Sequence, residues 1–350
     1  MEPTNEAAVM TAESTEGKKG ITGSTLKIIA IITMFIDHFA AVILDSYLGA
    51  NGLNDLDPMD IQASMEWMSK YAPIYYADVV MRCIGRLAFP IFIFLLVEGF
   101  VHTRNRMKYA IRLFVFALVS EIPFNLSFTG YALSEPTTFA YQSVFWTLLA
   151  GFLFMWYANF IEEKETPQIA KMLLTGASLI LGGFTGTRCL GLVDRVVVGM
   201  VKAPSSASFA VKFAITVVGL LILYIVWSSK KGKEKALELG TILTGLFVLM
   251  LAANYGNTDY GAWGVLAIAF AYFFKGTNKG KIIAPVVILT IMQFFEAFAF
   301  FDVLFIKKYN GKRGLKLKYF FYAFYPLHLL LFYMISWFMG CRPGRLFLGF

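Results

Sequence analysis

Charged side chains are scarce in this 350-residue chain. Asp, Glu, Lys and Arg make up 15% of it, whereas soluble domains hold about 25%. Hydrophobic residues reach 58% and aromatic residues 17%. This composition excludes an ordinary soluble domain and predicts a polytopic membrane protein of the all-α class, held in a lipid bilayer.

Cysteine is also scarce, which excludes two further classes. Cys83, Cys189 and Cys341 are widely separated and form no CxxC pair, so the sequence predicts neither a disulfide framework nor a zinc or other metal site. The net charge of +8 would suit nucleic acid, but the basic residues of a membrane chain are first needed in cytoplasmic loops. We therefore expect no nucleic-acid partner.

Apolar runs of about 20 residues, the length that crosses a bilayer, recur along the chain. We predict one bundle of about ten transmembrane helices over residues 21–341, with a disordered cytoplasmic tail at 1–20 and a short C-terminal tail at 342–350. Residues 186–205 are predicted as an outer loop or as a re-entrant or interfacial helix. The predicted spans lie near 25–44, 83–101, 109–128, 138–160, 168–185, 209–228, 237–253, 261–274, 282–305 and 319–339.

Lys and Arg in short loops indicate the orientation. The loops 102–108, 230–235 and 275–281 are basic and alternate with loops poor in basic residues, which predicts a cytoplasmic N-terminus. The acidic segment 45–81 is then an external loop that could cap a cavity. The basic loop 307–318 breaks the pattern, because ten spans place it outside. Either the count is wrong by one, or these charges hold an anionic group.

Ionisable side chains inside spans are rare and are candidates for function. If the first span runs outward, the rise of 1.5 Å per residue places His38 in its outer half. The last span then runs inward and brings its own polar groups to the same zone. A polar chamber at this depth would hold His38, Arg86, Glu121, Tyr325 and His328.

Several pairings of these groups stay open. Asp37 lies about 100° around the helix from His38, so it could pair with Arg86 or cap another helix, and Glu121 could equally orient His38. Alternatively, Asp37 and His38 could merely bridge two spans through hydrogen bonds. Arg82 is expected to extend to the outer head groups.

A second polar group is predicted at the cytoplasmic surface. Glu98 and His102 share a helix face at i, i+4 spacing, and Arg104 and Arg106 follow. Such a cluster could hold phosphates. Alternatively, the arginines could serve only to keep this loop on the cytoplasmic side of the membrane.

Five strings of polar residues within apolar sequence recur in order between residues 26 and 332: LKIIAIITMFIDH, GRLAFPIFIFLLVEGFVHTRN, RLFVFALVSEIPFNL, TDYGAWGVLAIAFAYF and NGKRGLKLKYFFYAFYPLHLLL. They resemble the TraX family of membrane proteins. The resemblance implies a bacterial plasma-membrane acetyltransferase that uses acetyl-coenzyme A. It also implies an acceptor such as the N-terminal amine of a pilin, and leaves other envelope peptides or polymers open.

The resemblance also suggests roles for the polar residues. In related multispan acyltransferases a first-span histidine and later arginines are implicated, so His38 is the expected base. Arg86 is expected either to stabilise an oxyanion or to neutralise a buried carboxylate. Asp37 and Glu121 complete the expected catalytic group. We expect coenzyme A to bind at Glu98, His102, Arg104 and Arg106, and the acceptor at Asp259, Tyr260, Tyr325 and His328.

Two other functions compete with acetyl transfer. Buried Asp, Glu, His and Arg also form the proton relays of transporters, although the two halves of the chain show no convincing similarity of the kind that inverted repeats produce. A non-catalytic factor for pilus or envelope assembly would be able to lose His38 without losing activity.

Overall fold

The computed structural model describes residues 20–57, 59–129, 141–194, 198–199, 201, 204–315 and 318–341. These residues form helices and no strand, with two isolated bridges, which confirms the all-α class. The predicted tails lie outside the described residues, except for Gly20. Eight helical segments are long and apolar enough to cross a membrane: Gly23–Ala50, Ile61–His102, Arg106–Phe128, Val144–Glu163, Gln168–Cys189, Ser205–Lys231, Lys233–Tyr255 and Phe320–Phe338.

Two predicted spans correspond to helices that are too short for that length. The helix α12, Gly261–Phe273, has 13 residues, and α13, Asn278–Met292, has 15. The predicted span 282–305 is interrupted at Gln293, whose backbone is extended with φ −151° and ψ 125°. A 3-10 helix, η4, and the short helix α14 follow this break, at Phe294–Phe301 and Asp302–Lys307 respectively.

The acidic segment 45–81 is largely helical, so the prediction of a loop is wrong for most of it. It contains α3, Asp45–Ala50, and most of α4, Ile61–Gly85. The side chain of Asp60 caps α4 by accepting a hydrogen bond from the Ala63 N–H at 3.0 Å, which satisfies a free donor of the first turn.

The contacts of the chain divide it into two compact units. Unit 1 contains both ends of the sequence, and unit 2 most of its middle. The boundaries fall within the helices α5, Ala88–His102, and α6, Arg106–Phe128. Unit 1 is Met1–Gly99, Ile122–Pro136 and Phe273–Phe350, and unit 2 is Phe100–Glu121 and Thr137–Tyr272.

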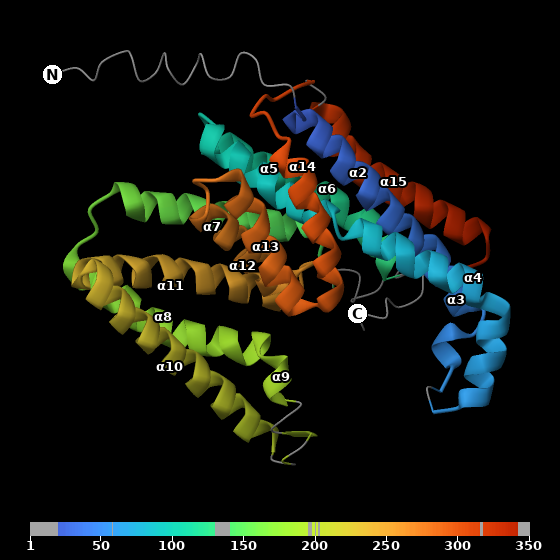
Figure 1. Cartoon of the computed structure of the whole chain (residues 1–350), viewed down its shortest axis with the longest axis horizontal. Helices are drawn as coiled ribbons and strands as arrows, with labels where there is room; N and C mark the ends of the chain where they lie inside the picture. Colours follow the sequence, from blue (N-terminus) through green and yellow to red (C-terminus); the bar gives the residue numbers. More distant parts are fainter. Residues whose placement is uncertain are drawn as a thin grey trace. The chain divides into compact units, whose positions relative to one another are not determined.

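In unit 1, the first long helix, α2, Gly23–Phe39, packs beside α4 and α15, Lys318–Phe338 (Figure 1). The helices α2 and α15 run in the same direction, because contacts advance along both. Lys27 Nζ lies 5.5 Å from the centre of the Phe321 ring, and the ring centres of Phe35 and Phe332 lie 4.8 Å apart. The expectation that the last span runs opposite to the first is therefore wrong.

The basic loop is attached to the start of α2 in an arrangement that we call the terminal strap, residues 20–24 with 307–315. The Ile21 N–H donates to Lys308 O at 2.8 Å, and the Gly23 N–H to Lys312 O at 2.8 Å. Gly314 has φ +73°, and a Cβ there would collide with the Thr22 and Ser24 side chains. The basic loop thus lies at the N-terminal end of α2, so the two share one side of the membrane.

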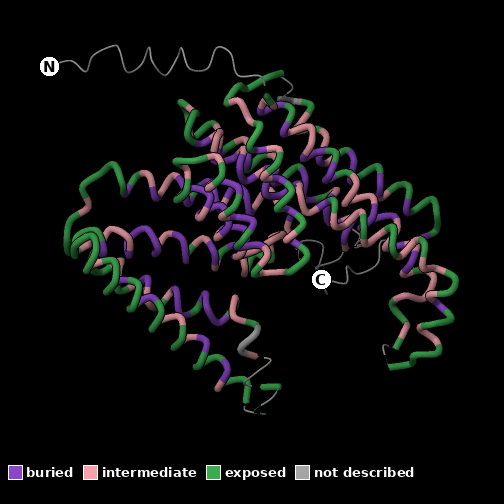
Figure 2. The backbone as a smooth tube through the Cα atoms, viewed as in Figure 1, coloured by how far each residue is buried: buried purple, intermediate pink, exposed green. Residues whose placement is uncertain are grey.

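In unit 2, α8, Gln168–Cys189, packs against α10, Ser205–Lys231, and α11, Lys233–Tyr255. Glycines on α8 make close approach possible, since a Cβ at Gly182 would collide with Leu220, as expected where small residues let membrane helices pack tightly. Most of α10 stays exposed in Figure 2. Its exposed side chains are mainly apolar, which suits contact with lipid.

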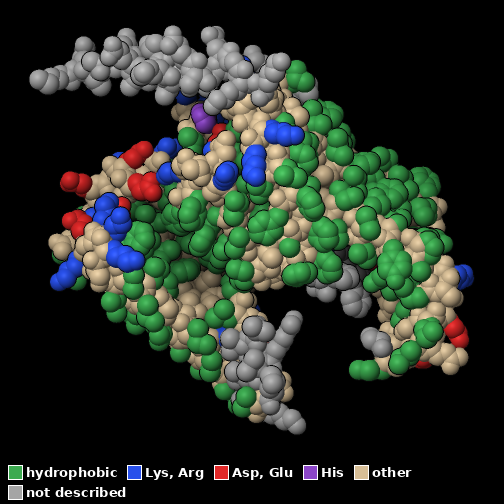
Figure 3. Space-filling model, viewed as in Figure 1, with side chains coloured by type: hydrophobic (Ala, Val, Ile, Leu, Met, Phe, Trp, Pro, Cys, Tyr) green, Lys and Arg blue, Asp and Glu red, His purple; other side chains and the backbone are tan. Residues whose placement is uncertain are grey.

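The surface has the distribution expected of a multi-pass membrane protein. In Figure 3 apolar side chains cover much of the visible face, and charged side chains gather toward helix ends. No water lies in the hydrocarbon region to satisfy polar groups, so such a face suits lipid rather than solvent.

Candidate functional site

Two histidines from α2 and α15 are in direct contact in unit 1. His38 Nδ1 and His328 Nε2 are 2.7 Å apart, and the two ring planes differ by 4°. The other nitrogen of His328, Nδ1, lies 2.7 Å from the Phe324 carbonyl oxygen. We call this arrangement the histidine pair.

The hydrogen bonds assign the protons of the histidine pair. A carbonyl oxygen only accepts, so His328 Nδ1 must carry hydrogen, and a neutral His328 then accepts at Nε2. His38 Nδ1 is consequently the donor, which leaves the lone pair of His38 on Nε2. No hydrogen bond to His38 Nε2 is formed by the described residues, so this nitrogen can take a proton from a ligand.

Aromatic rings surround the histidine pair. His38 lies edge-on to Phe128 and Tyr325, with ring centres 5.3 and 5.9 Å away. His328 is buried and His38 half-buried. Such a setting limits the access of water to the pair while His38 keeps some exposure.

Beside the histidine pair, two arginines of the α4 region form ion pairs. Arg82 contacts Asp37 at 2.8 Å, and Arg86 donates to the buried Glu296 at 3.1 Å. The open pairing of Asp37 with Arg86 is not found, and the expectation that Arg82 extends to head groups is wrong. A Cβ at Gly85 would collide with the Asp37 side chain, so α4 can approach α2 this closely only because residue 85 is glycine.

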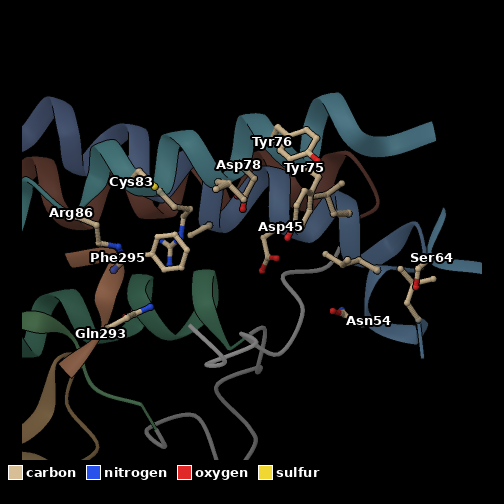
Figure 4. A pocket seen from close by; sticks show the side chains of 16 residues that line it. Asp45, Asn54, Ser64, Tyr75, Tyr76, Asp78, Cys83, Arg86, Gln293 and Phe295 are labelled. Carbon is tan, nitrogen blue, oxygen red and sulfur yellow. The ribbon is translucent and has the colours of Figure 1, made fainter. Parts of the chain in front are cut away.

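A cavity of about 600 Å³ lies along α3 and α4 (Figure 4). In the view of Figure 4, Arg86, Gln293 and Phe295 are at one end, Asn54 and Ser64 at the other, with acidic groups between them. Its lining includes Ala41, Asp45, Asn54, Ser64, Tyr75, Tyr76, Asp78, Arg82, Cys83, Arg86, Gln293 and Phe295.

Asp45 and Asp78 line this cavity and are not among the site residues predicted from the sequence. Both lie in the segment predicted as an external loop. A signal for one of them exists, because Asp78, Arg82 and Arg86 are spaced i, i+4, i+8 and so share a face once the segment is recognised as helical.

Glu121, the other predicted partner of His38, belongs to unit 2. It accepts hydrogen bonds from Trp146 Nε1 at 2.8 Å and from the Ser143 N–H at 3.4 Å. Ser143 is the residue before α7, Val144–Glu163. The contacts of Glu121 therefore include an anchor for the start of α7.

The predicted coenzyme A group is divided between the units. Glu98 forms an ion pair with the buried Lys281 and accepts from Tyr309 Oη at 3.4 Å. Burial, and then the Glu98 carboxylate, raise the pKa of Tyr309 to about 12, so it stays a donor. In unit 2, His102 and Arg104 are exposed, and Arg106 donates to Asn159 Oδ1 at 3.3 Å.

The predicted acceptor residues are likewise divided. Tyr325 and His328 lie in unit 1, in contact with each other, with ring centres 5.8 Å apart. Asp259 and Tyr260 form the turn between α11 and α12 in unit 2. Asp259 accepts from Tyr141 Oη at 2.8 Å, and its N–H donates to Gln142 O. These two contacts stabilise the turn.

No group of three or more His, Cys, Asp or Glu in the described part of the chain is placed to hold a metal ion. The histidine pair and the cavity beside the paired arginines are the parts of unit 1 that could bind a ligand or take part in a reaction.

Comparison with known proteins gives a family and one informative relative. The family described as TraX protein matches residues 22–218 and 189–336. The chain is 26% identical over 309 residues to a protein of Dichelobacter nodosus named "Probable fimbrial assembly protein FimC, serogroup H1", covering 87% of this chain and 92% of the relative. No solved structure matches. With a match that runs from α2 into α15, the chain belongs to the TraX family, as a multi-pass membrane protein.

Proposed function

We propose that the chain is a membrane acetyltransferase that moves an acetyl group from acetyl-coenzyme A to an acceptor at the cell envelope. The histidine pair carries this proposal, because its hydrogen bonds leave a lone pair on His38 Nε2. The fimbrial assembly relative supports a pilin N-terminal amine or another envelope peptide or polymer as the acceptor.

The chemistry needs a proton acceptor beside the attacking atom. The acceptor nitrogen or oxygen attacks the thioester carbonyl carbon and loses its proton to His38 Nε2. The carbon–sulfur bond then breaks, and the thiolate of coenzyme A takes that proton from His38. Throughout, His38 Nδ1–H stays bonded to His328 Nε2, so His328 holds the ring in place.

The phosphates of coenzyme A need cations, and two sets are available. His102, Arg104 and Arg106 are the set predicted from the sequence. In the basic loop, Lys312 and Arg313 are exposed and form no ion pair with described residues. The loop is the better candidate because it is bound to α2 and leads directly into α15, and these two helices carry the histidine pair.

Labelled acetyl-coenzyme A supplied to membrane vesicles tests the proposed activity. The wild type, His38→Ala and the control Lys279→Ala, which changes an exposed residue outside both phosphate sets, are compared, and label in coenzyme-free products is followed by mass spectrometry. We expect labelling in the wild type and control, and a loss of about a hundredfold or more in His38→Ala, as for removal of a general base. Equal labelling in all three would remove His38 as the base.

The same assay separates the two phosphate sites. Charge reversal at Lys312 and Arg313 should raise KM for acetyl-coenzyme A with little change in kcat, because these cations contact the nucleotide and not the reacting carbon. If Arg104→Glu raises KM instead, the cytoplasmic group predicted from the sequence is the correct one.

A non-catalytic role in pilus assembly is the second candidate, and the similarity to a probable fimbrial assembly protein favours it. It predicts that His38→Ala supports normal assembly of surface fibres in cells.

A further inference from the structure

We propose that Asp302 is a proton-binding site, and that the segment formed by η4 and α14 packs into the bundle only while this carboxyl group carries a proton. Asp302 lies outside the histidine pair and outside the lining of the cavity, and its protonation does not depend on acetyl transfer. Three features support the proposal: the path of the segment, the burial of Asp302 and the charges around it.

The segment from α13 to α14 enters the bundle of unit 1 and returns to the end from which it started. The helix α13 packs against η4 and α14 (Figure 1), and the extended residue Gln293 separates the two arms. Glu98 contacts both ends, because it pairs with Lys281 near the start of α13 and accepts from Tyr309 Oη just after α14 at 3.4 Å. Asp302 therefore belongs to a segment that is inserted into the bundle and not to a surface loop.

One face of this segment is buried and the other carries exposed aromatic rings. Side chains three residues apart along a 3-10 helix point the same way, and Glu296, Ala299 and Asp302 follow this spacing, each with 0% exposure. The exposed side chains of η4 are all phenylalanines: Phe294, Phe295, Phe298, Phe300 and Phe301. Such a surface suits lipid, so water does not reach Asp302 from this side.

The surroundings of Asp302 are apolar. Its buried neighbours on the same face, Ala299 and Ile306, belong to a core cluster shared with α2, α5 and α13. The other members of this cluster are Leu26, Ala30, Ile91, Phe94, Ile282 and Val286. Both carboxyl oxygens of Asp302 are buried and form no hydrogen bond with a described residue. An ionised carboxylate here would have neither water nor a partner, which is far more costly than the neutral acid.

Within the described part of the chain, the charged groups beside this segment already have other partners. The elements packed against it contribute three ion pairs: Arg86 with Glu296, Lys281 with Glu98, and Arg82 with Asp37. Four further titratable groups lie toward the terminal strap: Lys27, Lys307, Lys308 and Tyr309. Lys27 lies over the Phe321 ring, Tyr309 donates to Glu98, and the other two lysines are exposed. None of these groups bonds to Asp302.

A metal ion would not satisfy Asp302, but a proton would. Cations such as Ca²⁺ and Mg²⁺ need about six oxygen ligands, whereas the buried neighbours of Asp302 are apolar. In the described chain, no group of three or more His, Cys, Asp or Glu is placed to hold a metal ion. Arg86 balances Glu296, so Arg86, Glu296 and Asp302 together need one more positive charge to be neutral. A proton on Asp302 supplies that charge and needs no further ligands.

Infrared spectroscopy of the full chain in lipid nanodiscs detects the proton directly, because a carboxylic acid and an ionised carboxylate absorb at different frequencies. Spectra at neutral pH are compared for the wild type, Asp302→Asn and the control Asp55→Asn, which changes an exposed aspartate. Subtracting the Asp302→Asn spectrum from that of the wild type should leave a carboxylic acid band, and the same subtraction for Asp55→Asn a carboxylate band. A carboxylate band for Asp302 would overturn the proposal.

Thermal unfolding in the same nanodiscs tests whether the proton is coupled to packing. An aspartate in the unfolded chain ionises at about pH 4, so above that pH the folded state holds one proton more than the unfolded state. Rising pH therefore favours unfolding, and Asp302 multiplies the unfolding equilibrium constant by about ten for each pH unit. Between about pH 5 and pH 8, the wild type should lose stability more steeply than Asp302→Asn does.

A second neutral variant, Asp302→Val, keeps the test decisive if the Asn variant does not fold. Valine is uncharged and apolar like the buried neighbours of Asp302, so this variant should fold and show the same shallow dependence on pH. Asp55→Asn should follow the wild type. Equal pH dependence in the wild type and the neutral variants would contradict the coupling. Failure of both neutral variants to fold would show that the charge of Asp302 is required, which also contradicts the proposal.

Discussion

A histidine can act as a base only if the correct ring nitrogen is free, and here one neighbour decides which nitrogen that is. His328 accepts from His38 Nδ1 because its own Nδ1 is bonded to the Phe324 carbonyl. Without this acceptor, His38 could place its proton on either nitrogen. In the proposed reaction His328 is therefore a positioning residue, which acts through His38.

Replacing His328 with Phe keeps a ring in the packing but removes the acceptor of the His38 proton. We expect kcat for acetyl transfer to fall about tenfold to a hundredfold, less than for loss of the base itself, with KM for acetyl-coenzyme A unchanged. His328→Gln offers a carbonyl oxygen to His38 Nδ1 and should recover part of the rate. Equal losses in the Phe and Gln variants would indicate a purely structural role.

At this scale the sequence identifies residues better than partners. His38 and His328 are recognisable because they interrupt apolar spans, and they do meet. The pairing of Asp37 with Arg82 was not predicted, because it depends on how each helix is rotated about its axis. Residue spacing within one helix carries no information about the rotation of its neighbour.

Among the elements, the contact between α2 and α4 depends on a glycine. Gly85→Ala places a methyl group against the Asp37 side chain, so we expect a loss of about 1–3 kcal/mol, as for other overpacked sites. Thermal unfolding in detergent measures it.

Two controls accompany this measurement. Gly176→Ala, where a Cβ meets nothing within 4 Å, should leave stability unchanged or slightly raised. The double change Gly85→Ala with Asp37→Gly should be as stable as Asp37→Gly alone, because Asp37→Gly removes the Cβ and the carboxylate that the methyl group contacts. A single Gly85→Ala variant as stable as Gly176→Ala would contradict the close approach.

The elements themselves are predicted well where apolar runs are long and poorly where they are not. The helix α4 escapes recognition because Glu66, Lys70 and Asp78 lower the apolar character of its sequence, although its cap and length are those of an ordinary helix. The predicted span 282–305 fails for another reason. Its composition is mostly apolar despite Glu296 and Asp302, and composition does not reveal the extended backbone at Gln293.

At the scale of the whole molecule, the terminal strap places the start of α2 and the basic loop before α15 on the same side of the membrane. The side of the membrane on which the basic loop 307–318 lies depends on whether the number of preceding spans is even or odd. One short helix, counted as a span or not, changes that number by one, so the sequence alone leaves the side open. The hydrogen bonds of residues 307–315 with the start of α2 place the loop on the same side as the N-terminal end of α2, whichever side that is.

Single cysteines test this arrangement in a chain whose three native cysteines are replaced by serine. Thr25→Cys and Lys312→Cys, both at exposed positions, should react with a membrane-impermeant maleimide in inverted vesicles and stay unlabelled in intact cells. We expect this end to be cytoplasmic, because Lys and Arg are in excess there. Labelling of the two positions from opposite sides would disprove the shared side.

The terminal strap and the histidine pair can form only at a late stage of protein synthesis. Ser24 and Leu315 are 291 positions apart in the chain, and His38 and His328 are 290 apart. Contacts between such distant positions form late, because the loop between them must be closed first. The first helix is therefore in the membrane without its contacts to α15 until the ribosome has synthesised the last helix. A nascent chain that stops before α15 contains His38 without its partner His328, so the proposed base is incomplete until synthesis of the protein is almost finished.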